Sequence, residues 1–297
     1  MKRTSVARGL TAAISLALAA CQSTVLDPGG PVGRGEKIIL IDSLAIMLAI
    51  VAPVIVATLI VAWWYRASNP SARYLPRWSF HGGIELVVWG IPFMVIILLG
   101  GVTWIGAHQF DPARPLAAKT PPLQIQVVAM DWKWLFIYPQ QQIASVNRVV
   151  VPAGVPLHFS LTSASVMNAF FVPQLGSMIY TMNGMTTELN LLADAPGIFH
   201  GLSAQFSGEG FSDMRFDLHS VSPEQFSAWV NRVRGNGLEL NAATYMELTE
   251  QGVPVSSSSF GEVDPQLFHR IVTLSLPPGR GPGTQRSGAA AAPRTDQ

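Results

Sequence analysis

The sequence has little cysteine and little charge. Cys21 is the only cysteine among 297 residues, which excludes an intramolecular disulfide and any metal site that needs two thiolates from this chain. Charged residues make up 12% of the chain, whereas soluble domains usually carry about 25%. The formal net charge is only +1, so no overall field would attract nucleic acid. With 49% hydrophobic residues and a mean hydropathy of +0.32, this composition indicates a membrane protein.

The N-terminus has the features of an export signal. Lys2, Arg3 and Arg8 form a positively charged region before the apolar run Gly9–Ala20. That run is too short to cross a hydrocarbon core of ~30 Å. The run ends in Leu18-Ala19-Ala20-Cys21, and small residues before a cleavage point are typical of secretory signals. A cysteine directly after them resembles the lipobox of bacterial lipoproteins. We therefore predict a signal peptide over residues 1–20 and a lipid anchor on Cys21, with an ordinary signal peptide and a chance cysteine as the alternative.

Two apolar runs predict membrane-spanning helices over residues 38–64 and 83–107, because each is long enough to cross a bilayer at about 1.5 Å per residue. The loop between them, residues 65–82, contains Arg66, Arg73 and Arg77 and no acidic residue. By the positive-inside rule this loop is cytoplasmic. Residues 21–37 and everything after residue 107 then lie outside, which agrees with the export signal.

Each predicted span contains one acidic residue, Asp42 in the first and Glu85 in the second. An ionisable group within a membrane is a functional hypothesis by default. Asp42, however, lies about one turn from the outer end of its predicted span, and Glu85 lies within one turn of the inner end of the other. Both can reach headgroups or a partner, so we expect interface anchoring or subunit contact rather than proton transfer.

The exported part begins with a linker over residues 108–122 that is rich in proline and alanine. Short apolar or alternating runs separated by turn signals then predict an all-β sandwich or barrel over residues 123–221. The predicted strands are Leu123–Val128, Trp134–Tyr138, Arg148–Val151, Pro156–Thr162, Ala169–Val172, Thr187–Leu192, Gly197–Gln205 and Met214–His219.

A small α-helical arm is predicted over residues 222–274. Ser222-Pro223-Glu224-Gln225 combines an N-cap, a proline at the first helical position and a glutamine at the third. Asn241 and Asp264-Pro265 predict two further helix starts. Residues 275–297 consist mainly of proline, glycine, alanine and arginine without periodicity, so we expect a disordered tail.

Several segments resemble subunit II of the haem–copper terminal oxidases. Residues 85–92, Glu-Leu-Val-Val-Trp-Gly-Ile-Pro, are similar to the second-helix motif of that family. Residues 162–173 are similar to its segment that carries the first histidine ligand of a copper site, and residues 193–208 are similar to its ligand loop. The resemblance covers residues 21 to 274, and it implies a two-helix transmembrane hairpin followed by a cupredoxin-like sandwich in the periplasm.

The resemblance also implies that the family's binuclear copper site is degenerate in this chain. The family builds that site from two bridging cysteines, two histidines, a methionine and a backbone carbonyl, and a copper pair requires such soft thiolate and imidazole donors. A thioether alone does not hold a copper pair, so we expect no metal, no cofactor and no catalytic residue here. The matching positions hold Asn168, Ser203, Gln205, Ser207, Phe211 and Met214.

A subunit II without this copper resembles the quinol-oxidase branch of the family, the cytochrome bo type. The lipobox, the run Asp131-Trp132-Lys133-Trp134 and the helical arm are similar to that branch too. The resemblance implies a partner subunit I that holds the haems and one copper, two smaller membrane subunits, and ubiquinol as the substrate of the complex. It implies electron transfer to oxygen with proton translocation in a bacterial inner membrane, and a structural or assembly role for this chain.

Trp132 and Trp134 alternate on a predicted strand, so their side chains should point to the same side. In the copper-bearing branch, aromatic residues at this place serve as the electron entrance, a role that has no acceptor without copper. We expect these two side chains to pack against subunit I or in the sandwich core.

Two other functions stay open at this point. The chain could be a subunit II of a cytochrome c oxidase, against which the missing cysteines count. It could also be a membrane-anchored cupredoxin-like binding module without an oxidase partner.

Overall fold

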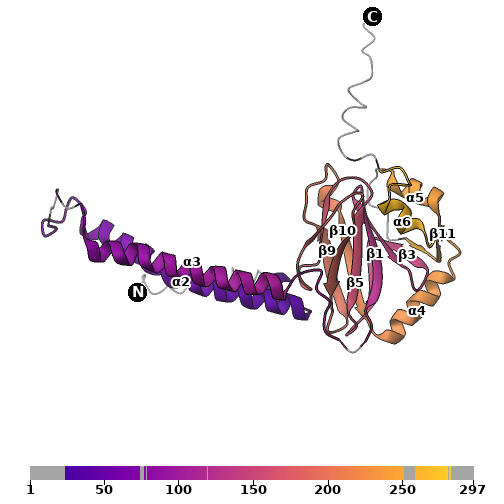
Figure 1. The fold of residues 1–297 in the computed structure, drawn as a ribbon, viewed down its shortest axis with the longest axis horizontal. Helices are drawn as coiled ribbons and strands as arrows, with labels where there is room; N and C mark the ends of the chain where they lie inside the picture. The colour runs from indigo at the N-terminus through magenta and orange to yellow at the C-terminus, as the bar shows by residue number, and fades with distance from the viewer. Residues whose placement is uncertain are drawn as a thin grey trace, which may run out of the picture. The chain divides into compact units, whose positions relative to one another are not determined.

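The computed structural model describes residues 24–73, 77, 79–118, 120–250, 258–279 and 281 (Figure 1). The chain divides into two compact units, one comprising Met1–Arg34 and Pro112–Gln297 and the other Gly35–Asp111. The predicted signal peptide over residues 1–20, and Cys21 with it, lie outside the described residues.

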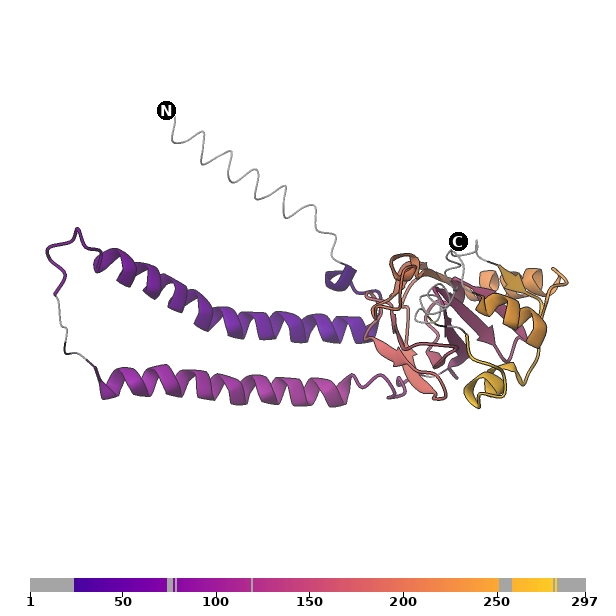
Figure 2. The same ribbon diagram turned by 90° about the horizontal axis from the view of Figure 1, so that it is seen from above.

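Two long helices, α2 (Pro31–Trp64) and α3 (Gly82–Gln109), form an antiparallel hairpin (Figure 2). They approach closely where a Cβ added to Gly106 would lie 2.7 Å from Cδ1 of Ile39. Both helices are long and apolar enough to cross a membrane. Their apolar side chains are exposed all round in the isolated chain, which is the pattern of a helix that lipid or partner helices surround.

Helix α2 begins at Pro31 instead of at residue 38, where we predicted the first span to start. Proline is favoured at the first position of a helix because its missing N–H needs no partner there. The polar residues that follow it extend the helix beyond the apolar run. Asp42 consequently lies about three turns from the start of the helix, at ~3.6 residues per turn, while its distance from the membrane surface stays a prediction.

The segment before α2 is attached to the β-domain. The Gly29 N–H donates to the Gln174 carbonyl at 2.8 Å, and the Gly29 carbonyl accepts from the Asp194 N–H at 2.9 Å. Arg34 forms an ion pair with the Asp194 carboxylate. At Gly30, a Cβ would lie 2.1 Å from the Leu192 carbonyl oxygen, so only glycine permits this close approach. The short 3₁₀ turn η1 (Thr24–Leu26) precedes this attachment.

Two sheets form a sandwich, which confirms the predicted all-β domain (Figure 1). The six-stranded sheet has the order β12-β3-β2-β1-β5-β8, and the five-stranded sheet has the order β4-β10-β9-β6-β7. Two pairs are parallel, β1 with β5 and β4 with β10, and the other pairs within these sheets are antiparallel. The strands are β1 (Leu123–Met130), β2 (Lys133–Tyr138), β3 (Ile143–Val146), β4 (Arg148–Pro152), β5 (Leu157–Ser163), β6 (Asn168–Phe171), β7 (Ile179–Thr181), β8 (Thr187–Leu191), β9 (Gly197–Ser203), β10 (Arg215–Val221) and β12 (Ser259–Phe260).

Strands β3 and β7 are absent from our sequence predictions. They have only four and three residues, and neither shows a period long enough to recognise.

The sandwich has a second core outside the first. Trp134, Phe136 and Tyr138 of β2 face the other sheet, whereas Leu135 and Ile137 face away from it. The outward set packs against the arm, which lies over this face in Figure 1. Strands β1 and β2 are therefore largely buried on both faces, and the β-domain with its arm has three layers. The arm residues in this second core are Leu240, Tyr245, Phe260, Val263, Leu267, Phe268, Ile271 and Leu276.

The arm contains helices and short strands. Helix α4 (Pro223–Arg234) begins with the predicted capping box, because Ser222 and Gln225 exchange hydrogen bonds, and Asn241 caps α5 (Ala242–Thr249) as predicted. Helix α6 (Leu267–Val272) begins shortly after Asp264. The arm is not purely helical, since β11 (Glu239–Leu240) pairs with β13 (Glu262–Val263) and β12 joins the sandwich at β3.

The first residues of the predicted disordered tail are docked instead. Leu276 is buried in the second core, with 7% of its surface exposed. Beyond it, the Gly279 N–H donates to the Ala164 carbonyl at 2.9 Å and the Gly281 N–H donates to Asp131 Oδ2 at 3.0 Å. Sequence composition missed this because the docking depends on partners that are distant in the chain. Residues 282–297 lie outside the described residues.

Tyr138 links the two sheets through its hydroxyl group. The hydroxyl donates to the Val150 carbonyl at 3.0 Å and accepts from the Val150 N–H at 2.9 Å, so β2 is tied to the backbone of β4. The ring is fully buried and packs against Trp229 of α4 at 5.3 Å. Burial raises the pKa of this hydroxyl far above its usual value, so it remains a donor at any physiological pH.

We predict that Tyr138→Phe lowers the free energy of unfolding by about 1–3 kcal/mol, because it leaves a buried backbone N–H and carbonyl without their partner. Tyr180→Phe is the control, since Tyr180 is 42% exposed. Thermal unfolding of the full chain in detergent measures both. Equal stability of the two variants would contradict the assigned role of the Tyr138 hydroxyl.

Candidate functional site

The six positions that the resemblance matches to copper ligands lie at one end of the sandwich. Asn168 opens β6, Ser203 closes β9, and Gln205 and Ser207 follow in the loop that leads to η2 (Phe211–Asp213) and Met214. Asn168, Ser203, Ser207 and Met214 are buried, with exposures of 0%, 3%, 4% and 1%. Gln205 and Phe211 are half-buried. We call the four buried side chains the loop cluster.

The loop cluster is held together by its own hydrogen bonds. The Ser203 hydroxyl donates to Asn168 Oδ1 at 3.2 Å, which joins β9 to β6, and its backbone N–H donates to the Met214 carbonyl at 3.1 Å. The Asn168 amide donates in turn to the Val166 carbonyl at 3.1 Å. Ser207 Oγ lies 4.0 Å from Met214 Sδ, a weak contact. Each buried polar side chain therefore has a partner within the protein.

These donors do not fit a copper pair. Two hydroxyls, one carboxamide and one thioether provide no thiolate and no imidazole, and hydroxyls cannot bridge two coppers as thiolates do. Among the residues that the structure describes, no group of three or more histidine, cysteine or acidic side chains could hold a metal ion. The loop cluster has a structural role, because its neutral contacts hold β6, β9 and the loop after β9 together.

Trp132 lies in the turn between β1 and β2, not on a strand as predicted. Its φ angle is +64°, a left-handed conformation that is costly for a bulky residue. The indole Nε1 donates to the Ser207 carbonyl at 3.1 Å, and the ring lies against Gly210, where a Cβ would approach it to 2.4 Å. Trp132 thus packs on the loop that contains Ser207 and is 8% exposed.

Trp134 points into the sandwich core and is fully buried. Its ring meets Phe170 and Phe216 edge-on, with centroid distances of 5.3 and 5.6 Å. Of the two places predicted for the tryptophans, subunit I or the core, Trp134 occupies the core. The core alternative is therefore confirmed for Trp134, whereas contact of Trp132 with a partner subunit stays a prediction.

Phe206 is the aromatic side chain that sequence analysis missed. It lies in the loop after β9 with 73% of its surface exposed, and its ring contacts Phe211 at 5.6 Å. A half-buried and an exposed aromatic residue therefore stand beside the loop cluster. The only feature of the sequence that indicated a place for Phe206 beside the loop cluster is its position between Gln205 and Ser207.

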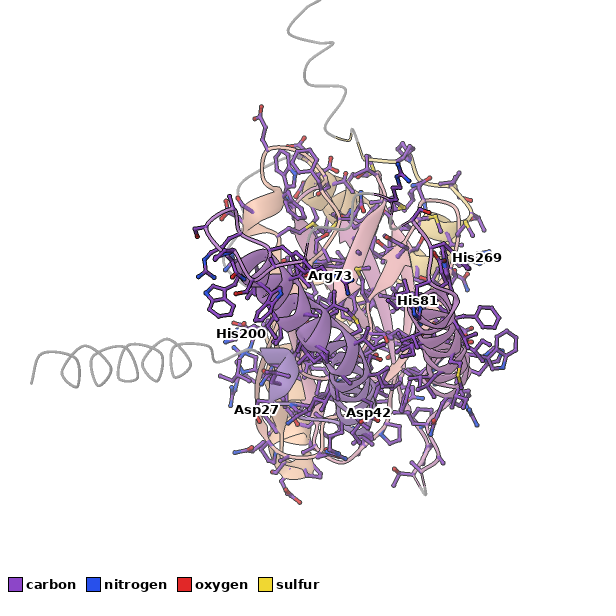
Figure 3. The ribbon with its side chains drawn as sticks, turned by 90° about the vertical axis from the view of Figure 1, so that its left-hand side faces the viewer. Asp27, Asp42, Arg73, His81, His200 and His269 are labelled. Atoms are coloured by element: carbon purple, nitrogen blue, oxygen red, sulfur yellow. The ribbon has the colours of Figure 1, made fainter. Side chains whose placement is uncertain are left out.

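Asp42 and Glu85 lie in the helical hairpin. Both side chains are exposed, and Asp42 is labelled on α2 in Figure 3. Glu85 is in the first turn of α3, as predicted for the inner end of that span, and its Oε2 accepts from Trp89 Nε1 at 3.2 Å. An exposed carboxylate on an apolar helix needs a polar neighbour from outside the chain or a position near headgroups.

Two histidines of the sandwich, His158 and His200, have separate partners. In the six-stranded sheet, Nδ1 of His158 on β5 lies 3.0 Å from Asn190 Oδ1. In the five-stranded sheet, Nδ1 of His200 on β9 lies 2.7 Å from Asp217 Oδ1 on β10. The His200 side chain is 74% exposed and projects from the surface in Figure 3. An exposed pair of this kind contributes little to stability.

The chain is similar to known proteins over most of its length. Residues 136–221 match the family model described as cytochrome c oxidase subunit II, periplasmic domain. Ubiquinol oxidase subunit 2 of Acetobacter aceti is 48% identical over 267 residues, covering 89% of this chain and 86% of that protein. Cytochrome bo(3) ubiquinol oxidase subunit 2 of Pseudomonas aeruginosa is 47% identical over 264 residues, covering 89% and 80%. The protein of that name from Pseudomonas putida is 46% identical over 257 residues, covering 86% and 82%.

The loop cluster gives a matched pair of substitutions. Ser203→Ala leaves the buried Asn168 Oδ1 without its hydroxyl donor, so we predict a loss of about 1–3 kcal/mol in the free energy of unfolding. Ser207→Ala removes only the weak contact with sulfur, and we predict a loss below about 1 kcal/mol. Denaturant titration of the full chain in detergent compares them. A loss at Ser207 as large as that at Ser203 would contradict the hydrogen-bond account of the cluster.

Proposed function

The chain belongs to the family of ubiquinol oxidase subunit 2 proteins, and on that premise we propose that it is the structural subunit II of an oxidase that passes electrons from ubiquinol to oxygen. The observation that carries the proposal is an identity of 46–48% to proteins of that name over 86–89% of the chain. Such identity includes the helical hairpin and the arm as well as the sandwich. Membership in this family makes the chain part of a membrane-anchored oxidoreductase complex.

We propose that the chain itself carries no redox centre. The loop cluster supports this, because its hydroxyl, amide and thioether groups are not the donors that a copper pair needs. A quinol dissolves in the lipid and can deliver its electrons within the membrane, so no electron entry site is required on the outer domain. The haems and one copper would then belong to the partner subunit I, with two smaller membrane subunits completing the complex.

The proposed topology places the β-domain in the periplasm of a bacterial inner membrane. The arginine-rich loop between α2 and α3 supports a cytoplasmic position for that loop. Both helices then cross the membrane, and the segment before α2 lies outside with the β-domain. This supports export of the N-terminus. We further propose cleavage before Cys21 and a lipid anchor on that residue, because Cys21 directly follows Leu18-Ala19-Ala20.

Asp42 and Glu85 are proposed to contact partner subunits. Carboxylates on apolar helices are placed where protein or headgroups can solvate them, and both are exposed in the isolated chain. We propose that the assembled enzyme, and not this chain alone, translocates protons, as the resemblance implies.

Isolation of the tagged chain in mild detergent tests the proposal. We predict that a haem-bearing subunit co-purifies and that the preparation consumes oxygen with a ubiquinol but not with reduced cytochrome c. Oxidation of cytochrome c by the complex would support the copper-bearing alternative. Absence of any haem protein from the preparation would instead support a separate binding module.

The same preparation tests the anchor through intact-mass analysis of the chain. A mature N-terminus at Cys21 that carries the mass of attached lipid is expected. An unmodified N-terminus elsewhere would refute the lipid anchor without affecting the oxidase assignment, which rests on the family relationship.

A further inference from the structure

Two buried charged residues, Asp131 in the turn between β1 and β2 and Lys133 at the start of β2, have no part in the proposed function. Asp131 and Lys133 flank Trp132 and are only 4% and 3% exposed. A buried charge is costly unless it is paired and hydrogen-bonded, so such residues in a surface turn need a reason. Burial lowers the pKa of the Lys133 ammonium, while the nearby carboxylates of Asp131 and Glu250 act in the opposite direction.

Asp131 binds the docked tail, and Lys133 binds the C-terminal arm. Asp131 accepts from the Gly281 N–H through Oδ2 at 3.0 Å and from the Ser165 hydroxyl through Oδ1. Lys133 Nζ donates to the Glu250 carbonyl at 3.0 Å, immediately after helix α5. Asp131, before Trp132, therefore binds the docked tail at Gly281, and Lys133, after Trp132, binds the end of α5 at Glu250.

The docked tail crosses the loop between β5 and β6. We call residues 276–279 together with Gly281 the strap. The side chain of Leu276 anchors the strap in the second core, and Gly279 donates to the Ala164 carbonyl at 2.9 Å before Gly281 reaches Asp131. Ala164 donates in turn to the Ala129 carbonyl of β1 at 2.8 Å. The strap thus lies on the loop that leads directly to Asn168 of the loop cluster.

The turn between the two charges carries the strained residue. Trp132 keeps a left-handed backbone, and its side chain holds the loop after β9 through the Ser207 carbonyl and Gly210. A bulky residue leaves that conformation unless its surroundings fix it. Asp131 and Lys133 fix it from both sides, since one neighbour of Trp132 is bound to the strap and the other to the arm.

We propose that the strap and the two buried charges form a brace that holds the loops of the degenerate copper site in place. A bound metal would tie such loops together and stabilise them through its ligands. The donors present here do not fit a copper pair, so another restraint is needed. The brace supplies it by fixing Ser165 near Asn168 on one loop and Trp132 against Ser207 on the other. This inference concerns the chain alone and does not depend on which electron donor the oxidase uses.

Two truncations of the full chain separate the strap from the residues beyond it. A chain that ends at Leu276 keeps the core anchor and lacks the rest of the strap, whereas a chain that ends at Thr284 retains the strap. Hydrogen–deuterium exchange in detergent is measured for residues 163–168 and 203–214, with residues 133–138 of β2 as the internal reference. For the shorter chain we predict exchange roughly 5- to 30-fold faster in both loops, the factor expected when a strained left-handed residue loses its support. The longer chain should match the wild type.

Asp131→Asn provides a second route if the shorter chain does not fold. It removes the charge and one of the two acceptor contacts and should increase exchange in the same two loops. Glu247→Gln is its control, because it also removes one carboxylate but lies exposed on α5, away from the brace, and should leave exchange in both loops unchanged. Wild-type exchange in both loops of the shorter chain or of Asp131→Asn would overturn the brace, and so would an equal increase in the loops and in β2.

Discussion

Burial of β1 and β2 on both faces is the constraint on which the outer domain depends. In an ordinary sandwich one face of each sheet meets water, and the strands alternate between apolar and polar residues. Here Leu135 and Ile137 face away from the sandwich core and are buried as completely as its inward residues. Something must cover that face, and the arm does so with its own apolar side chains. The arm is therefore part of the domain's core and not an appendage.

The chain that follows the arm also reaches the end of the sandwich where the loop cluster lies. After the arm, Leu276 of the strap closes the second core, Gly279 binds the loop between β5 and β6, and Gly281 binds Asp131. Neutral hydrogen bonds between Ser203 and Asn168 hold the inner part of that end. A domain with the topology of a copper protein can thus keep its loops ordered with side chains in place of metal ligands. This is consistent with a subunit that supports an oxidase without carrying its electrons.

Much of the architecture could be predicted from local sequence signals. Turn residues and short apolar runs located the sandwich, and the Ser222–Gln225 capping box located α4, because caps act within one helical turn. The resemblance to known oxidases located the loop cluster. The start of α2 was missed because the polar residues after Pro31 extend the helix beyond the apolar run that defines a span.

The remaining errors concern features that depend on tertiary contacts. Alternation of Trp132 and Trp134 predicted a strand, but the left-handed turn at Trp132 depends on Ser207, a residue distant in the chain. Burial of Asp131 and Lys133 could not be predicted, because a charged turn is normally solvated. Composition predicted a disordered tail from residue 275, since it cannot show that Gly279 and Gly281 have backbone partners elsewhere.

The central claim is that this chain is an oxidase subunit without a copper centre of its own. The most direct test is the copper content of the purified complex per copy of this chain, read together with the absorption of copper–thiolate bonds. The account predicts copper only in the amount that the partner subunit I holds, with no thiolate absorption. Additional copper that scales with this chain, or a copper–thiolate spectrum, would contradict it.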